Sequence, residues 1–413
     1  MLYPFPKPAS DPRRVVITGV GIVTALGIGW KKNADGFRSG QRAFRPVTLF
    51  DVNRQRTREA AEVDLPEHFP KTRLSEKQRL RLDRAALQLL LAASEAWNQG
   101  GWKPSESIPF VLGTTSGGMP LGEDYFRHAQ NSPTTQRGQP TRLTSYQAQR
   151  QAIDVMSALG FTGPLTIIAN ACASGGNAIG HAFEQIRLGR ADQVLAGGYD
   201  GLSQLVFAGF DSLQALSTTQ CSPFCADRDG LGLGEGAGVL AIESLESAHK
   251  RNAIILGEVV GYGAATDVHH LTQPHPEGNA ALQSMNEACR VAKLEPGQID
   301  YINAHGTGTP LNDGAEAAAI NRWAGNHARN IKVSSTKGSV GHILGGAGAI
   351  EAVISLMALN GQWIPPGRTT GKIDPICQFD YVTQPRDTKM EHVLSNSFGF
   401  GGANATLLFR RSK

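Results

Sequence analysis

Residues 14–21, Arg14-Val15-Val16-Ile17-Thr18-Gly19-Val20-Gly21, form an apolar run that ends in glycines. Such a run predicts a buried strand that leads into a tight turn. The same pattern returns at residues 255–263, Ile255-Leu256-Gly257-Glu258-Val259-Val260-Gly261-Tyr262-Gly263. The repetition indicates that the chain consists of two related halves.

Strands and helices are expected to alternate along both halves. Further buried strands are predicted at residues 193–198, 237–242, 301–303 and 332–334, and helices at residues 84–97, 178–187, 245–251, 279–293, 313–323 and 348–359. This alternation predicts an α/β fold with helices packed on sheets. A polar segment with three prolines, residues 114–150, interrupts the pattern and is expected to be a surface excursion or an interface element.

Composition excludes several classes of protein. The chain has 413 residues, 40% of them hydrophobic, which suits two or three domain-sized units. Its net charge is only +4 and its basic residues are mostly dispersed, so neither nucleic acid nor a membrane is expected as a partner. Residues 1–8 hold three prolines and no signal-like apolar core, and no run reaches about 18 apolar residues. Five cysteines, an odd number, favour free thiols and the cytoplasm.

Cys172 is the candidate nucleophile. It lies in Asn170-Ala171-Cys172-Ala173-Ser174-Gly175-Gly176, where an apolar run breaks into small residues at the expected start of a helix. A helix N-terminus favours a thiolate, and small neighbours leave space for a bulky thioester. An arbitrary cysteine is more often an inert core residue, and the remaining four are interpreted as structural: Cys221, Cys225, Cys289 and Cys377.

Two histidines occupy similar glycine-rich turns. His305 follows a short apolar strand and precedes Gly306-Thr307-Gly308-Thr309, and His342 ends the stretch Lys337-Gly338-Ser339-Val340-Gly341-His342. A lone histidine is more often structural, but two such turns and one such cysteine together predict a site for thioester chemistry. Neither histidine has a second histidine or a carboxylate at helical ligand spacing, so no metal site is expected.

Four motifs occur together and in one order: the Cys172 segment, residues 305–310, residues 335–342, and Asn396-Ser397-Phe398-Gly399-Phe400-Gly401-Gly402. With Arg228-Asp229-Gly230 and residues 234–238, they make the chain resemble the β-ketoacyl-acyl-carrier-protein synthases of the elongating, KAS II-like type. The likeness extends from Arg13 to Phe409 and so covers nearly the whole chain.

The resemblance implies a thiolase-like five-layered αβαβα fold made of two duplicated halves, residues 1–253 with the cysteine and residues 254–413 with both histidines. It implies no cofactor, since the substrates are carried on the phosphopantetheine of acyl carrier protein. Cys172 would take the acyl chain, and the enolate from malonyl carrier protein would attack that thioester. The backbone N–H groups of Cys172 and Phe400 would donate to the acyl oxygen, and His305 and His342 to the malonyl thioester oxygen.

The resemblance also assigns supporting acidic and basic residues. Lys337 and Glu316 match positions that form an ion pair near the histidines, and Asp313 matches a further acidic position in that shell. A buried structural pair that keeps the turn in register is an equal alternative.

A further set of residues is implied in substrate binding. Thr307 and Thr309 match residues that bind the pantetheine arm, with simple turn capping as the alternative. Phe400 lies between glycines and matches a gatekeeping aromatic on a mobile loop. Phe398 and Asn404 complete this set.

A basic cluster consists of Lys77, Arg79, Arg81 and Arg84. Charge runs of this size are usually solvated faces. Acyl carrier proteins are acidic, however, and the resemblance implies docking through this region, so carrier docking is an equal interpretation.

Departures from the family pattern leave alternatives open. Asp200 stands where a glutamate is frequent, Ala403 stands where threonine is common, and residues 114–150 match poorly. The enzyme is therefore expected as a homodimer or as the catalytic subunit of a heterodimer with a chain-length factor, in fatty acid synthesis or a specialised polyketide or polyene pathway. A non-catalytic subunit would lack the nucleophile, and a thiolase would need a second cysteine in a glycine-rich context. These two alternatives, and a thioester hydrolase, are therefore weaker than a condensing enzyme.

Overall fold

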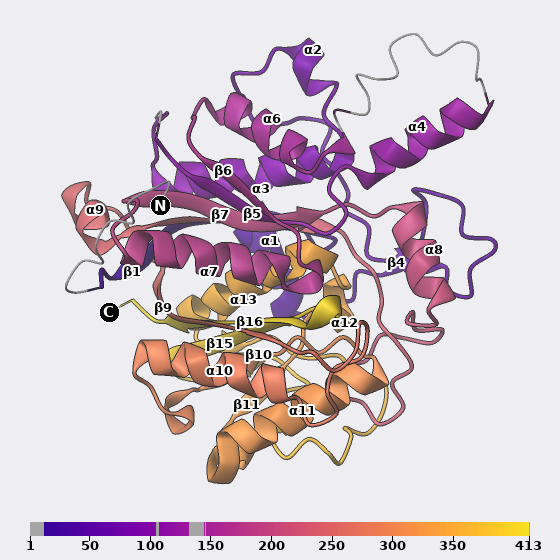
Figure 1. Ribbon diagram of the computed structural model, residues 1–413, viewed down its shortest axis with the longest axis vertical. Coiled ribbons are helices and arrows are strands. Elements are labelled where there is room, and N and C mark those ends of the chain that lie inside the picture. The colour runs from indigo at the N-terminus through magenta and orange to yellow at the C-terminus, as the bar shows by residue number, and fades with distance from the viewer. Residues whose placement is uncertain (1–11, 105–106, 132–143, 145, 413) are drawn as a thin grey trace.

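The computed structural model describes residues 12–104, 107–131, 144 and 146–412. The proline-rich residues 1–8 and part of the polar segment 114–150 lie outside the described residues. Figure 1 shows five layers, with two sheets separated by helices and covered by helices on their outer faces. The expected five-layered αβαβα fold is thus confirmed.

The upper sheet belongs to the N-terminal half. Its strands, in spatial order, are β1 (Val15–Thr24), β8 (Gly236–Ser244), β7 (Gln193–Asp200), β5 (Phe110–Gly113) and β6 (Leu165–Ile168), and the short β2 (Gly27–Ile28) pairs with β1. Its outer face carries α3 (Arg84–Gly100) and α6 (Gln149–Leu159). The Asp83 side chain accepts a hydrogen bond from the Ala86 amide and so caps α3, and Gly101 ends this helix at φ 64°.

The lower sheet belongs to the C-terminal half. Its strands, in spatial order, are β9 (Gly257–Thr266), β16 (Ala403–Arg410), β15 (His392–Phe398), β10 (Tyr301–Asn303), β11 (Lys332–Ser334) and β13 (Asp380–Tyr381). Its outer face carries α10 (Asn279–Ala292) and α11 (Pro310–Ala324). The two sheets are joined where β1 pairs with β9, between Val15 and Val259.

The two halves share one pattern of strand pairing. In the upper sheet, β1, β8 and β7 are antiparallel neighbours, and β7, β5 and β6 are parallel neighbours. In the lower sheet, β9, β16 and β15 are antiparallel neighbours, and β15, β10 and β11 are parallel neighbours. This repeated order demonstrates the duplication expected from the similar runs at residues 14–21 and 255–263. The expected ends of these two strands were wrong, because β1 continues past its glycines to Thr24 and β9 continues past its glycines to Thr266. The division between residues 253 and 254 stays a prediction.

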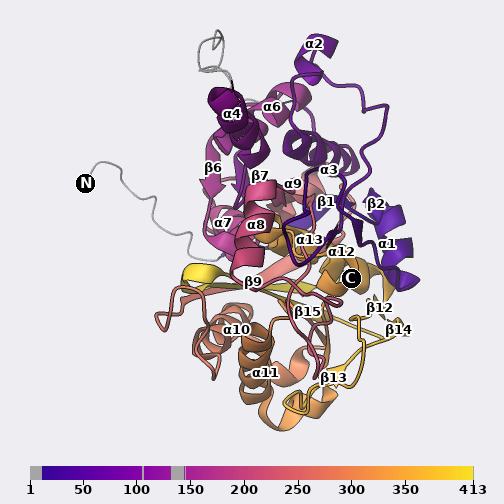
Figure 2. The same ribbon diagram turned by 90° about the vertical axis from the view of Figure 1, so that its right-hand side faces the viewer.

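The middle layer consists of α7 (Ser174–Arg187) and α13 (Ala347–Gly361), with the upper half above it and the lower half below it in Figure 2. These helices approach closely because their contacting residues are small: a Cβ on Gly175 would lie 2.8 Å from the Ala349 amide nitrogen.

The segment Leu344–Gly361 is long and apolar enough to cross a membrane, but 89% of it is buried inside the protein. Burial on all sides identifies it as a core helix.

The remaining elements lie around these layers. They are α1 (Trp30–Arg38), α2 (Glu76–Arg79), α4 (Met119–Asn131), α8 (Gln204–Ser212), α9 (Leu245–Lys250) and α12 (Lys337–Val340), with the strand pairs β3 (Arg45–Pro46) with β4 (Glu59–Ala60) and β12 (Trp363–Ile364) with β14 (Arg386–Asp387).

The polar segment 114–150 begins differently from the expected surface excursion. Thr114 and Ser116 follow β5 and are only 1% and 6% exposed. Both side chains donate hydrogen bonds to the carboxylate of Asp200. The start of the segment is therefore buried near the middle layer, and α4 follows it outward (Figure 1).

Candidate active site

Cys172 lies at a sharp turn between β6 and α7. The chain passes from β6 through the 3-10 turn Ala171–Ala173, and α7 begins at Ser174. Ala171 has φ 56°, a left-handed conformation that is uncommon without glycine. The Ser174 hydroxyl stabilises the turn, since it accepts from the Asn170 amide at 2.9 Å and donates to the Ala171 carbonyl at 2.6 Å. The strand-turn-helix setting predicted for Cys172 is confirmed.

One pocket of about 310 Å³ brings the predicted catalytic residues together, with Cys172, His305 and His342 all on its wall. This follows from the duplication, because Cys172 follows β6, His305 follows β10, and His342 follows β11 and α12. The two imidazole rings lie 5.3 Å apart and nearly perpendicular, at 82°. The residues come from opposite sheets, so the site exists only where the halves meet.

Lys337 fixes the orientation of His305. Its Nζ donates to the His305 carbonyl at 2.5 Å and lies 3.3 Å from His305 Nδ1. A lysine ammonium can only donate, so Nδ1 is the acceptor and the ring proton of His305 is on Nε2. The ion pair of Lys337 is with Glu351, not with Glu316 as the resemblance implied. Glu351 lies on α13, fourteen residues further along the chain.

Glu316 holds the His305 turn through hydrogen bonds. Its carboxylate accepts from the amides of His305 at 2.9 Å and Gly306 at 2.7 Å, and from the Asn396 side chain at 3.1 Å. It is 1% exposed, and burial raises its pKa to about 7. Its role is to satisfy buried donors, which a carboxylate does with both oxygens.

Asp313 supports the next residues of the same turn. It accepts from the Thr307 amide at 2.9 Å and the Gly308 amide at 3.1 Å, and from the Phe224 amide at 2.8 Å. The guanidinium of Arg228 lies 3.7 Å away. Asp313 thus joins the turn to the chain near Phe224 and does not reach the pocket wall itself.

Burial sets the protonation of the three pocket residues. It lowers the pKa of both His305 and His342 well below 6.5, and the positive charge of Lys337 lowers them further. Both imidazoles are therefore neutral at pH 7, and each carries one N–H. Burial also raises the pKa of the Cys172 thiol to about 12, although Lys337 opposes this. Burial therefore opposes the thiolate form that the helix N-terminus favours.

The loop after β15 closes one side of the pocket. Phe400 is 40% exposed, and its ring stacks on Phe210 of α8 at 6.0 Å and 23°. The loop is also tied to a neighbouring loop, where the Gly401 amide donates to the Leu271 carbonyl at 2.7 Å. Gly399 packs so closely that a Cβ there would lie 3.0 Å from the Cys172 amide nitrogen. The Phe400 loop therefore lies against the backbone of Cys172.

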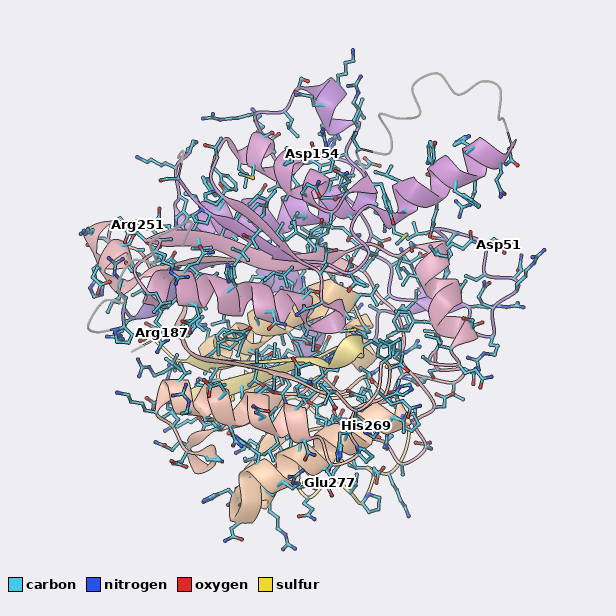
Figure 3. All side chains as sticks on the ribbon, in the orientation of Figure 1. Asp51, Asp154, Arg187, Arg251, His269 and Glu277 are labelled. Atoms are coloured by element: carbon cyan, nitrogen blue, oxygen red, sulfur yellow. The ribbon has the colours of Figure 1, made fainter. Side chains whose placement is uncertain are left out.

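The implied substrate-binding residues line the same pocket. The hydroxyls of Thr307 and Thr309 lie 2.8 Å apart and share a hydrogen bond. The Asn404 side chain donates to the Gly402 carbonyl at 2.8 Å, and the Phe398 ring lies 5.7 Å from that of His305. Asp267 and residues 270–274, which the sequence did not single out, also line the pocket, and Figure 3 labels the neighbouring His269.

The four residues of the basic cluster differ in their exposure and contacts. Arg84 donates to both oxygens of the buried Glu235 at 2.9 Å, so its guanidinium is held in an internal ion pair, and its docking role stays a prediction. Arg79 lies over the Phe69 ring at 5.6 Å and 3.9 Å from Glu76. Lys77 and Arg81 are exposed. None of the four lines the described pocket.

The described residues form no group of three or more His, Cys, Asp or Glu side chains that could hold a metal ion. All five cysteines are free thiols, and Cys221 donates to the Thr307 carbonyl at 3.4 Å. A thiol beside two neutral imidazoles suits transfer of an acyl group and stabilisation of a developing oxyanion.

Comparison with known proteins gives one consistent result. The family model for the β-ketoacyl synthase N-terminal domain matches residues 12–248, and the model for the C-terminal domain matches residues 256–370. The 3-oxoacyl-[acyl-carrier-protein] synthase 2 of Synechocystis sp. is 38% identical, over 97% of this chain and 99% of its own.

Solved structures agree with this result. The ishigamide ketosynthase/chain length factor is 30% identical, with a TM-score of 0.90, over 98% of this chain and 100% of its own. A β-ketoacyl synthase from Burkholderia phymatum is 33% identical, with a TM-score of 0.87, over 97% of this chain and 100% of its own.

Proposed function

The chain belongs to the β-ketoacyl synthase family, and on that premise we propose that it is an acyltransferase that condenses an acyl chain on Cys172 with malonyl carrier protein and releases carbon dioxide. The observation that carries this proposal is that the Cys172 thiol and the neutral imidazoles of His305 and His342 line the same pocket.

Acyl transfer is the first half of the reaction. The Cys172 sulfur attacks the thioester carbonyl of acyl carrier protein, and the pantetheine sulfur leaves with the thiol proton. Negative charge develops on the carbonyl oxygen during the attack. The amides of Cys172 and Phe400 are proposed to stabilise it, which the close contact of Gly399 with the Cys172 amide supports.

Decarboxylation and condensation are the second half. Loss of carbon dioxide from the malonyl group leaves an enolate whose charge rests on the thioester oxygen. His305 donates from Nε2, because Lys337 occupies the Nδ1 side, and His342 donates alongside it. The enolate carbon attacks the Cys172 thioester, a carbon–carbon bond forms, and the released Cys172 thiolate takes up one proton. Neutral imidazoles suit this role, since each keeps one proton to donate throughout.

The substrates are proposed to arrive on acyl carrier protein, as the name of the Synechocystis relative indicates for that protein. Both substrates carry their acyl group on its phosphopantetheine arm, so no further cofactor is needed. Exposed Lys77 and Arg81, with Arg79 beside them, are the proposed contacts for an acidic carrier. Thr307, Thr309, Phe398 and Asn404 are proposed to contact the bound substrate along the pocket wall. A cytoplasmic location fits these carriers.

A second candidate is a role as the catalytic subunit of a heterodimer with a chain-length factor. The TM-score of 0.90 to the ishigamide ketosynthase/chain length factor favours it. The alternative is a homodimer in fatty acid elongation. The mass of the purified chain in solution distinguishes them: a dimer that condenses alone supports the homodimer, and an inactive chain that needs a second protein supports the heterodimer.

The proposed activity is tested with purified protein, acyl carrier protein loaded with an acyl chain, and malonyl carrier protein, with Cys172→Ser as the control. Formation of a β-ketoacyl product by the wild type and its loss in Cys172→Ser would support the proposal. Free fatty acid without a β-ketoacyl product would refute it in favour of a hydrolase. Condensation retained by Cys172→Ser would refute the assignment of the nucleophile.

A further inference from the structure

Asp200 is a fully buried carboxylate for which the proposed reaction has no direct use. It ends β7 and is 0% exposed. Its two oxygens accept hydrogen bonds from six groups on two separate segments of chain. So many donors on one side chain indicate that it holds these segments together.

The first segment follows β5. Asp200 accepts from the Thr114 hydroxyl at 2.7 Å, from the Thr115 amide at 2.9 Å, and from both the amide and the hydroxyl of Ser116 at 2.8 and 2.7 Å. The Thr114 hydroxyl in turn accepts from the Gly117 amide at 3.0 Å. The end of β5 is thus wrapped around one carboxylate.

The second segment is the turn that carries His342. Asp200 Oδ2 accepts from the Gly345 amide at 2.7 Å and from the Gly346 amide at 3.3 Å. Gly345 lies three residues after His342 in the chain. The same oxygen also accepts from Thr115, so one atom links the His342 turn to the end of β5.

This turn also packs against the helix that follows Cys172. A Cβ on Gly345 would lie 2.5 Å from the Thr115 amide nitrogen, and a Cβ on Gly175 would lie 2.8 Å from the Gly345 carbonyl oxygen. Gly175 is three residues after Cys172, on the first turn of α7. The position of Gly345 therefore sets the spacing between His342 and Cys172.

We propose that Asp200 is a positioning residue that fixes the His342 turn relative to Cys172, so that His342 can donate to the enolate oxygen. The inference rests on the proposed condensation. It requires the carboxylate itself: in an asparagine of the same shape, one oxygen becomes an NH₂ group that faces N–H or O–H donors. Either the His342 turn or the end of β5 then loses its acceptor.

The two half-reactions are expected to respond differently. Acyl transfer needs Cys172 and its neighbouring amides, and the negative charge of Asp200 does not assist it. Burial is the main cause of the raised pKa of the Cys172 thiol, and the charge of Asp200 raises this pKa further. Decarboxylation needs His342 in place, and displacement of a catalytic group by about 1 Å can cost about 100-fold in rate.

The test compares Asp200→Asn with the wild type in two assays. The first measures acylation of Cys172 by loaded acyl carrier protein, with intact-protein mass spectrometry as the readout. The second measures release of carbon dioxide from malonyl carrier protein. We expect acylation to be retained and decarboxylation to fall at least about tenfold. Equal loss in both assays, or no loss in either, would overturn the inference. A wild type that acylates but does not decarboxylate would instead refute the proposed function, and the inference with it.

Glu243→Gln is the matched control for a buried carboxylate. Glu243 is also 0% exposed and accepts from Thr18, Ser247 and Arg251. It lies seven residues along β8 from the residue that pairs with Asp200, a distance of about 23 Å. Figure 3 labels its partner Arg251 at the left edge of the molecule. In this variant, acylation and decarboxylation are expected to fall by the same factor, which is set by the fraction of protein that is folded.

A second variant covers the case in which Asp200→Asn does not fold. Thr114→Val keeps the shape of the side chain and removes one donor to Asp200 and one acceptor for Gly117. Loss of one hydrogen bond should reduce decarboxylation about fivefold more than acylation. An equal effect on both assays in this variant would overturn the inference.

Discussion

The substitution Glu316→Gln tests how the His305 turn is held. In the folded protein, burial raises the pKa of Glu316 from 4.5 to about 7. Because the folded pKa lies above the unfolded one, Glu316 stabilises the fold while it is protonated in the native state, and this contribution is lost as the pH rises through about 7. Glutamine mimics the protonated carboxyl group and has no such pH dependence.

The size of the effect follows from the two pKa values. With 4.5 in the unfolded chain and about 7 in the native state, Glu316 contributes about 2.5 kcal/mol more stability at pH 5 than at pH 8. The wild type should therefore lose about 2.5 kcal/mol relative to Glu316→Gln over this range. Other buried acids titrate equally in both proteins and cancel in the comparison.

The assay is urea denaturation of both proteins at pH 5 and pH 8 and at one fixed protein concentration. The exposed Glu246→Gln serves as the control, and its difference from the wild type should not change with pH in this way. A difference between wild type and Glu316→Gln that is the same at both pH values would refute the reasoning. A wild type that gains stability relative to the variant as the pH rises would refute it more strongly, because the sign would be reversed.

Three further predictions concern the surface, the ion pair and the loop. Lys77→Glu with Arg81→Glu should weaken turnover of carrier-bound substrate about tenfold more than turnover of a small thioester mimic, and equal losses on the two substrates would remove the docking proposal. Glu351→Gln should lower the free energy of unfolding by about 3 to 5 kcal/mol, because Lys337 keeps a buried charge without its partner; a loss under about 1 kcal/mol in denaturant titrations would contradict this. Gly399→Ala should slow acylation of the nucleophile at least about tenfold, because the new Cβ would displace the loop; unchanged acylation in a mass-spectrometric time course would argue against the oxyanion role of this loop.

Local sequence was sufficient for part of the secondary structure, including the turn that carries Cys172. The apolar run before Cys172 and the small residues after it predicted the strand, the turn and the start of α7, because turns and helix starts depend on residues close in the chain. The strands β15 and β16 were not predicted, although their apolar residues were visible in the sequence.

Long-range partners could not be predicted in this way. Lys337 pairs with Glu351 instead of Glu316, and only the folded arrangement of the chain decides between these two buried glutamates. Arg84 reaches Glu235, 151 residues away, and so leaves the surface that its neighbours share. The pKa of Cys172 also depends on burial by the whole fold, which a helix N-terminus in the sequence does not reveal.

The central claim is that Cys172 carries the acyl chain while His305 and His342 act on the malonyl group. The most direct measurement is intact-protein mass spectrometry of His305→Ala and His342→Ala after incubation with acyl carrier protein, with carbon dioxide release from malonyl carrier protein measured in parallel. Both variants should form the acyl-enzyme and lose most of the decarboxylation. Absence of the acylated species in both variants would contradict the account, because the histidines would then serve to activate Cys172.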